Sequence, residues 1–161
     1  MGSSDGRVVI VTGSARGLGR AHALAFAADG ARVLVNDLGV ERDGSAGTSD
    51  AANEVVEEIR AAGGEAEANA ADVADWQQAG AMVQQAIDTW GGLDTLVCNA
   101  GFLRDRMLAG MSEDEWDSVT RVHLKGHFAP ARHAIEFWRA RSKAGEPVAA
   151  RVVNTSSGAG L

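Results

Sequence analysis

Apolar and polar positions along the chain follow two alternating patterns. Short apolar runs, several of them β-branched, predict strands near residues 7–12, 31–37, 65–70, 93–98 and 149–155. Between them, the spacing of apolar residues predicts helices near 17–29, 50–62, 75–90 and 112–142. Strands that alternate with helices in this way are typical of βαβ units, so the sequence predicts an α/β domain with a parallel sheet.

Local signals support several of these boundaries. Gly30 and the pair Gly63-Gly64 follow helical patterns and are typical C-terminal caps. Ser112 with Glu115 three residues later predicts a capping box at the start of the 112–142 helix. The polar, Gly- and Ser-rich stretch 39–50 predicts a mobile loop.

The expected topology is a Rossmann-type, doubly wound parallel sheet that is truncated after the fifth strand. Right-handed crossovers lead to this arrangement, because each helix must pack back onto the sheet. In such sheets a cofactor binds outside the carboxyl ends of the strands, where the strand order reverses. Residues 1–161 are predicted to form a single domain that binds NAD(P), and each site residue should lie at the end of a strand.

A glycine-rich turn gives the most specific functional signal. The apolar run at 8–12 leads into Thr12-Gly13-Ser14-Ala15-Arg16-Gly17-Leu18-Gly19 and then into a helical pattern. Gly13 allows a tight turn, Gly17 lets backbone approach a pyrophosphate, and Gly19 permits close helix packing. The helix N-terminus offers unpaired N–H groups to phosphates. A plain glycine-rich turn is the alternative. We expect cofactor contacts from Gly13, Ser14, Arg16, Gly17, Leu18 and Gly19.

The end of the second predicted strand bears on which cofactor binds. Asp37 follows the run 33–36, where a carboxylate can accept hydrogen bonds from the adenosine ribose and would repel a 2′-phosphate. Arg16 favours NADP instead, because a basic side chain in the turn can pair with a 2′-phosphate. Since Asp37 would directly oppose that phosphate, we predict NAD rather than NADP. A solvated loop aspartate is the alternative.

Two further strand ends carry candidate cofactor residues. Asp72 and Val73 follow the third strand, where they could meet the adenine edge, or Asp72 could cap the 75–90 helix. After the fourth strand, Asn99 can brace neighbouring backbone, and Gly101, next to Ala100, lets a cofactor lie close. Cys98, just before them, is expected to be a small buried apolar residue rather than a nucleophile.

Composition and charge restrict the possible partners. The chain has 161 residues, 22 acidic and 15 basic side chains, and a formal net charge of -7, which argues against nucleic acid and anionic membranes. No apolar run has the length of a membrane span, and the first residues lack the layout of a signal peptide. With one cysteine no internal disulfide forms, so we predict a cytoplasmic protein. No metal site is predicted.

The glycine turn, with three residues between its first two glycines, and the Asn-Ala-Gly at 99–101 resemble the short-chain dehydrogenase/reductase family. The resemblance spans essentially the whole chain. It implies hydride transfer between a secondary alcohol or ketone and nicotinamide. It also implies that Ser157 hydrogen-bonds the substrate oxygen. His123 stands where the family has an asparagine, so it either assists a proton relay or is structural.

A narrower resemblance comes from the loops. Residues 36–39, residues 99–106 and His123 look like the (3R)-hydroxyacyl-CoA dehydrogenase units of peroxisomal multifunctional enzymes and their bacterial relatives. This implies a 3-hydroxyacyl thioester, an acyl-CoA, as substrate. The family resemblance also implies a homo-oligomer for the full-length protein, with the helix at 112–142 suited to the interface.

One departure from the family concerns the catalytic base. The family uses a tyrosine in a Tyr-x-x-x-Lys motif beyond the serine, whereas this sequence contains no tyrosine and ends at Leu161. We expect the chain to be the N-terminal portion of such an enzyme, inactive or very slow alone, with its fifth strand as an exposed edge. The alternatives are a protein that binds dinucleotide without catalysis and an inactive fragment.

Overall fold

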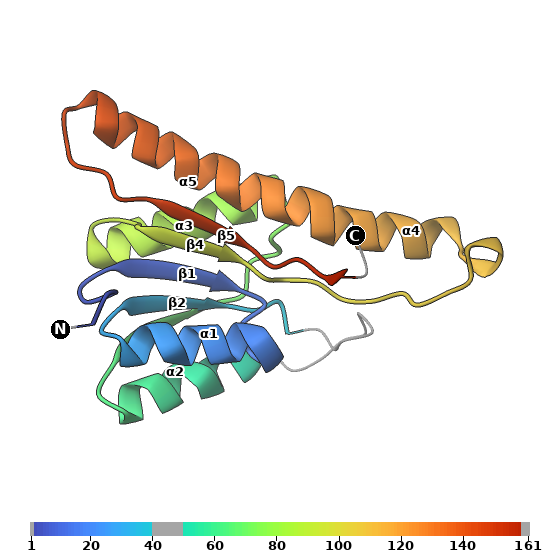
Figure 1. The fold of residues 1–161 in the computed structure, drawn as a ribbon, viewed down its shortest axis with the longest axis horizontal. Helices are drawn as coiled ribbons and strands as arrows, with labels where there is room; N and C mark the ends of the chain where they lie inside the picture. The colour runs from blue at the N-terminus through green and yellow to red at the C-terminus, as the bar shows by residue number, and fades with distance from the viewer. Residues whose placement is uncertain (1, 40–49, 159–161) are drawn as a thin grey trace.

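The computed structural model describes residues 2–39 and 50–158, which form a parallel sheet between two layers of helices (Figure 1). Most of the predicted 39–50 loop lies outside the described residues. The strands are β1 (Val8–Thr12), β2 (Arg32–Asn36), β3 (Glu65–Asn69), β4 (Thr95–Cys98) and β5 (Arg151–Asn154). They lie within the predicted ranges. The predicted range is longest relative to the observed strand at β5, where the sequence predicts 149–155 and Arg151–Asn154 is observed.

The sheet has the order β3-β2-β1-β4-β5, and every neighbouring pair is parallel. The chain moves outward from β1 through β2 to β3 and then crosses to β4 on the other side of β1. The strand order therefore reverses between β1 and β4, which confirms the predicted Rossmann-type arrangement. The carboxyl ends of β1 and β4 lie side by side at this reversal, where a crevice is expected.

Both faces of the central strands are buried, which explains their continuous apolar runs. Val9 and Val11 face helices α1 (Gly17–Ala28) and α2 (Ala51–Ala61). Val8 and Ile10 face α3 (Trp76–Trp90) and α5 (Gly126–Lys143). Figure 1 shows α1 and α2 below the sheet and α5 above it. The alternation of side chains along β1 thus divides the core into two layers.

The helical segment predicted at 112–142 is not one α-helix. It consists of α4 (Glu113–Thr120), a π-helical stretch η2 (Arg121–Lys125) and α5, and a short 3₁₀ turn, η1 (Leu108–Gly110), precedes it. The Gly126 N–H bonds to the Arg121 carbonyl, five residues back, which widens the helix by one residue. The prediction of a regular helix was wrong here, because the spacing of apolar residues does not reveal a single widened turn within a helix.

The helix caps agree with the sequence with one exception. The Ser112 Oγ accepts from the Glu115 N–H at 3.2 Å, and the Glu115 carboxylate accepts from the Ser112 N–H at 3.0 Å, so the capping box is confirmed. For α3, however, the cap is Asp75, whose Oδ1 accepts from the Gln78 N–H at 2.9 Å. Asp72, which the sequence suggested as a cap, lies three residues before Asp75. Its carboxylate accepts hydrogen bonds from Arg121 and from the Ala74 N–H instead.

The β5 strand forms one edge of the sheet. All four of its residues are exposed, including Val152 and Val153, which confirms the expected exposed edge. None of the described helices is long and apolar enough to cross a bilayer. Among the described residues, no group of three or more His, Cys, Asp or Glu side chains is arranged to hold a metal ion.

Candidate active site

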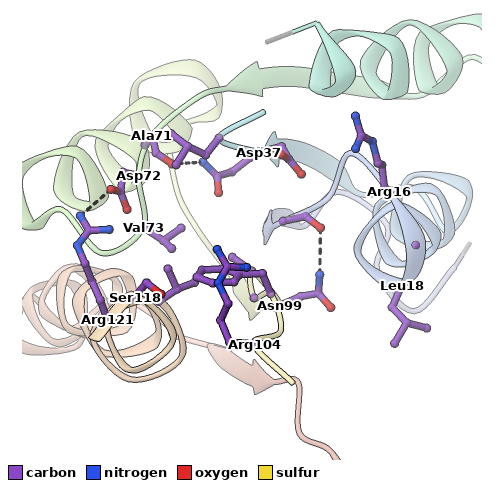
Figure 2. A pocket seen from close by; sticks show the side chains of 18 residues that line it. Arg16, Leu18, Asp37, Ala71, Asp72, Val73, Asn99, Arg104, Ser118 and Arg121 are labelled. Carbon is purple, nitrogen blue, oxygen red and sulfur yellow. Dashed lines mark hydrogen bonds and ion pairs between the residues drawn. The ribbon is translucent and has the colours of Figure 1, made fainter. Parts of the chain in front are cut away.

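A pocket of about 510 Å³ opens at the carboxyl ends of β1, β2 and β4. Figure 2 shows its wall, to which the start of α1, the loops after β2 and β3, and the α4–η2 segment contribute. All predicted cofactor residues except Ser14 and Gly19 line it. The lining residues are Gly13, Arg16, Gly17, Leu18, Asn36, Asp37, Leu38, Ala71, Asp72, Val73, Asn99, Ala100, Gly101, Phe102, Arg104, Ser118, Arg121 and Val122.

The glycine-rich turn has the backbone conformation that its sequence implies. Gly13 and Gly17 have φ values of +61° and +55°, in the left-handed region where a side chain is strained. A Cβ on Gly13 would stand 2.7 Å from the Cα of Ala100. A Cβ on Gly19 would overlap the Gly13 carbonyl oxygen and stand 2.5 Å from Nδ2 of Asn99. The three glycines therefore let α1, the turn and the end of β4 approach closely.

The N-terminus of α1 opens onto the pocket and carries no acidic side chain in its own first turn. The N-cap of α1, Arg16, makes no side-chain cap hydrogen bond. The first N–H groups of an α-helix have no partner within the helix, and the helix dipole adds positive potential there. Gly17 and Leu18, at this terminus, both line the pocket. The arrangement suits an anionic group such as a diphosphate.

Ser14 stabilises the turn from within. Its side chain is fully buried, and its Oγ lies 2.8 Å from the Val11 carbonyl oxygen and 3.2 Å from that of Asn36. Because the hydroxyl is directed at backbone carbonyls, the Ser14 side chain holds the turn against β2 and does not line the pocket. Any contact of Ser14 with a cofactor would come through its backbone.

Thr12 and Asn99 join the two central strands under the pocket. The Thr12 Oγ1 accepts from the N–H groups of Asn99 and Ala100 at 2.9 and 3.1 Å and lies 3.3 Å from the Val97 carbonyl oxygen. The Asn99 Nδ2 donates to the carbonyl oxygens of Thr12 and Gly13 at 3.2 and 3.0 Å. These bonds fix the Asn-Ala-Gly segment to the glycine turn, as the sequence predicted for Asn99.

Asp37 is held at the pocket by two backbone groups. Its Oδ2 accepts from the Ala15 N–H at 3.0 Å, and its Oδ1 accepts from the Gly39 N–H at 2.9 Å. Its neighbour Asn36 is buried and donates to Oδ1 of Asn69 at 2.7 Å. The carboxylate therefore occupies a defined place at the end of β2 (Figure 2).

At the opposite wall, Asp72 forms an ion pair. Its Oδ2 accepts from Nη2 of Arg121 at 2.6 Å, and its Oδ1 accepts from the Ala74 N–H at 2.8 Å. Val73 packs closely on α5, since a Cβ on Gly126 would stand 2.8 Å from Cγ2 of Val73. The Asp72–Arg121 pair, drawn in Figure 2, links the β3–α3 loop to η2.

Sequence reasoning missed part of this wall. Ser118, Arg121 and Val122 line the pocket from α4 and η2. Their spacing of three and four residues places them on one helix face, which is the signal that could have found them. Phe102 and Arg104 follow the Asn-Ala-Gly motif directly and also line the pocket.

The two predicted catalytic residues do not line the pocket. His123 lies in η2, where its Nε2 is 2.8 Å from the Phe102 carbonyl oxygen and 3.3 Å from the Phe102 nitrogen. It thus contacts the segment that follows Asn99 and Ala100. Ser157 is exposed and lies three residues beyond β5, at the same edge of the sheet as the pocket.

Cys98 lies in the core as expected. Its side chain is buried between the sheet and the α3–α5 layer. Burial raises the pKa of the Cys98 thiol to about 12, which keeps it protonated at neutral pH. Since the thiolate is the nucleophilic form, Cys98 does not supply a nucleophile for the site.

Comparison with known proteins places this geometry in a family. A family model described as short chain dehydrogenase matches residues 7–161. The chain is 46% identical to peroxisomal multifunctional enzyme A of Dictyostelium discoideum, over 96% of this chain and 33% of the relative. It is 47% identical to hydroxyacyl-CoA dehydrogenase ChsB1 of Mycobacterium tuberculosis, over 98% of this chain and 49% of the relative.

A solved structure gives the same result. The crystal structure of a short chain dehydrogenase from Mycobacterium avium matches with a TM-score of 0.93 and 63% identity, over 99% of this chain and 55% of that one. The chain thus spans a third to about half of the length of these relatives. The matched fold, the glycine turn and the Asn-Ala-Gly segment agree, and the chain belongs to the short chain dehydrogenase family.

Proposed function

We propose that this chain binds NAD and takes part in hydride transfer between a secondary alcohol and the corresponding ketone, with a 3-hydroxyacyl thioester as the substrate. One observation carries the proposal. A single pocket combines the uncapped N-terminus of α1 with the Asp37 carboxylate, at the reversal of strand order between β1 and β4. These are the two features needed to hold a diphosphate and a ribose diol.

The donor set fits a dinucleotide. N–H groups at Gly17 and Leu18 would hold the diphosphate, and the absence of acidic side chains from the first turn of α1 leaves its positive end available. Val73 and Leu38 supply apolar surface to the same pocket, which suits an adenine ring. When bound, the nicotinamide supplies the centre that accepts or donates the hydride.

Asp37 supports NAD over NADP. Because two backbone N–H groups hold its carboxylate, the negative charge stays at the pocket, where it would accept from ribose hydroxyls and repel a 2′-phosphate. Arg16 also lines the pocket and is the feature that favours NADP. A fixed carboxylate is the stronger discriminator, since an extra phosphate brings close to two further negative charges near it.

Ser157 and His123 have separate roles in this proposal. The Ser157 hydroxyl would hydrogen-bond the substrate oxygen and hold it for hydride transfer. His123 would keep the Asn-Ala-Gly segment in place through its contacts with Phe102, and so align the cofactor. A part for His123 in a proton relay is compatible with that position. The sequence contains no tyrosine, and we assign no general base to this chain.

The proposal of a thioester substrate is based on the names of the relatives. Several are named as peroxisomal multifunctional enzymes, and one is named a hydroxyacyl-CoA dehydrogenase. Sequence identity of 43–47% over nearly the whole chain supports assigning the same substrate class to this chain. A cytoplasmic location and a homo-oligomer remain predictions. Trp116, Leu124 and Phe128 on the α4–α5 segment are each more than half exposed, which fits self-association there.

Titration with reduced cofactors tests the proposal. The purified protein is titrated with NADH and with NADPH while cofactor fluorescence and thermal unfolding are followed. We expect saturable NADH binding, tighter than NADPH binding, and a raised Tm. A matched assay with a 3-hydroxyacyl-CoA and NAD then tests turnover. NADH binding without turnover agrees with the lack of a tyrosine base in this sequence and supports only the cofactor-binding part of the proposal. Failure of both cofactors to bind would overturn the proposal.

A further inference from the structure

The Arg104 side chain is fixed against the wall of the dinucleotide pocket. Its guanidinium carbon lies 4.8 Å from the centroid of the Phe102 ring, a cation–π arrangement. Its Nη1 donates to the Leu103 carbonyl oxygen at 3.2 Å. Arg104 and Phe102 both line the pocket. Figure 2 shows Arg104 extending toward the middle of the view, between Val73 and Asn99.

Among the residues that the structure describes, no carboxylate pairs with Arg104. Arg121, which also lines the pocket, is paired with Asp72 at 2.6 Å. Within residues 2–39 and 50–158, Arg104 makes no ion pair, although its side chain is half-buried. A half-buried guanidinium that stacks on an aromatic ring and opens onto a pocket is suited to binding an anion.

We infer that Arg104 binds a phosphate group of the nucleotide ligand held in this pocket. The inference rests on the proposed function, because it requires a nucleotide there. The N-terminus of α1 carries only about half an elementary charge, which is less than a diphosphate bears. A guanidinium on the facing wall supplies a full charge and a planar fork of donors. The two cationic elements would then contact the ligand from opposite sides.

Two ligands could present this phosphate ester. One is the diphosphate of the dinucleotide, and the other is a phosphate of a coenzyme A thioester that enters beside it. The shared chemistry is a phosphate monoester or diester on a nucleotide. Arg104 follows Asn99-Ala100-Gly101 closely in the sequence and lines the same pocket, so its guanidinium would be available to either ligand there.

Binding measurements with an Arg104→Met variant test the inference. Methionine keeps much of the length and apolar contact with Phe102 but removes the charge. The matched control is Arg139→Met, because Arg139 is exposed on α5 and is not part of the pocket. Affinities for NADH, ADP-ribose, coenzyme A and adenosine are measured by fluorescence and calorimetry, and thermal unfolding verifies that each variant is folded.

We expect R104M to bind NADH and ADP-ribose about 10-fold more weakly than wild type, with unchanged adenosine affinity. Arg104→Lys should recover part of the loss. A loss confined to coenzyme A would identify the thioester as the source of the phosphate. Equal affinities of R104M and wild type for all four ligands, or an equal loss in R139M, would overturn the inference. If wild type itself binds no NADH, the proposed function has failed instead.

Discussion

The His123 imidazole lies so close to Gly101 that a Cβ on Gly101 would stand 2.5 Å from the ring carbon Cε1. The same ring contacts the Phe102 backbone through Nε2. The π-helical stretch η2 brings His123 to this place, so the widened turn and the glycine depend on each other. Gly101 is therefore needed for packing on the histidine as well as for any approach of a cofactor.

Gly101→Ala should destabilise the protein. The added methyl must displace the exposed His123 ring from its contact with the Phe102 backbone, and loss of one such hydrogen bond lowers the free energy of unfolding by about 1 kcal/mol. Denaturant unfolding measures this change, and an NADH titration should show weaker binding. The double variant Gly101→Ala/His123→Ala removes the ring and should recover part of the stability. Strictly additive effects of the two substitutions would contradict the contact as the cause.

Thr12→Val should be costly although the two side chains have nearly the same shape. The substitution leaves the N–H groups of Asn99 and Ala100 without the Oγ1 acceptor at a site that is 1% exposed. Because these donors are part-buried, the loss of their acceptor should cost about 1 kcal/mol each. The free energy of unfolding is the measurement, and Thr12→Ser, which keeps the hydroxyl, is the control. A valine variant as stable as the serine variant would show that the bonds contribute little.

Asp37→Asn should shift cofactor preference toward NADPH. The amide keeps the size of the side chain but removes the negative charge that opposes a 2′-phosphate. We expect the ratio of NADPH to NADH affinity to rise about 10-fold, equivalent to about 1.4 kcal/mol. Titration of both cofactors measures the ratio. Asp114→Asn, at an exposed position in α4 outside the pocket, should leave it unchanged.

The buried Cys98 thiol predicts a dependence of stability on alkaline pH. Its pKa is raised from the ordinary value of 9.0 to about 12, so the unfolded chain loses the thiol proton first as pH rises. Stability from the neutral buried thiol is therefore full below pH 9 and declines between 9 and 12. The free energy of unfolding should fall about 1.4 kcal/mol per pH unit more steeply than in Cys98→Ala. Parallel pH profiles would contradict this.

Ser157→Ala separates cofactor binding from chemistry. Because Ser157 does not line the pocket, NADH affinity should stay at the wild-type value. Because the sequence contains no tyrosine base, turnover of a hydroxyacyl substrate is expected to be slow, and if the Ser157 hydroxyl holds the substrate oxygen, kcat should fall about 100-fold or more below that level. Ser156→Ala, at the neighbouring position, is the control. Equal activity of the Ser157 variant and wild type would remove Ser157 from the proposed mechanism.

The parts of the structure that sequence predicted best are those set by local backbone chemistry. The continuous run of β-branched residues in β1 predicted the strand, and the positive φ angles at Gly13 and Gly17 follow from residues that tolerate them. The capping box at Ser112 is equally local. These features depend on neighbours in the sequence, so they can be predicted from it.

Features set by tertiary contacts could not be predicted. Asp75 caps α3, whereas Asp72, three residues earlier, pairs with Arg121, far along the chain. The π-helical stretch likewise reflects packing of His123 and Gly126 on distant segments. A residue such as Arg104 becomes a candidate only when the fold places it on the wall of the same pocket as the glycine turn.

The parallel register of the sheet has a consequence for how such a site can change over evolution. Every strand ends at the same edge, so each wall of the pocket comes from a different loop, while Thr12 and Asn99 fix the floor. An insertion after β2 or β4 would remodel one wall and leave the floor in register. Nucleotide recognition and substrate choice can therefore diverge separately, while the strands and the hydrogen bonds between Thr12 and Asn99 stay unchanged.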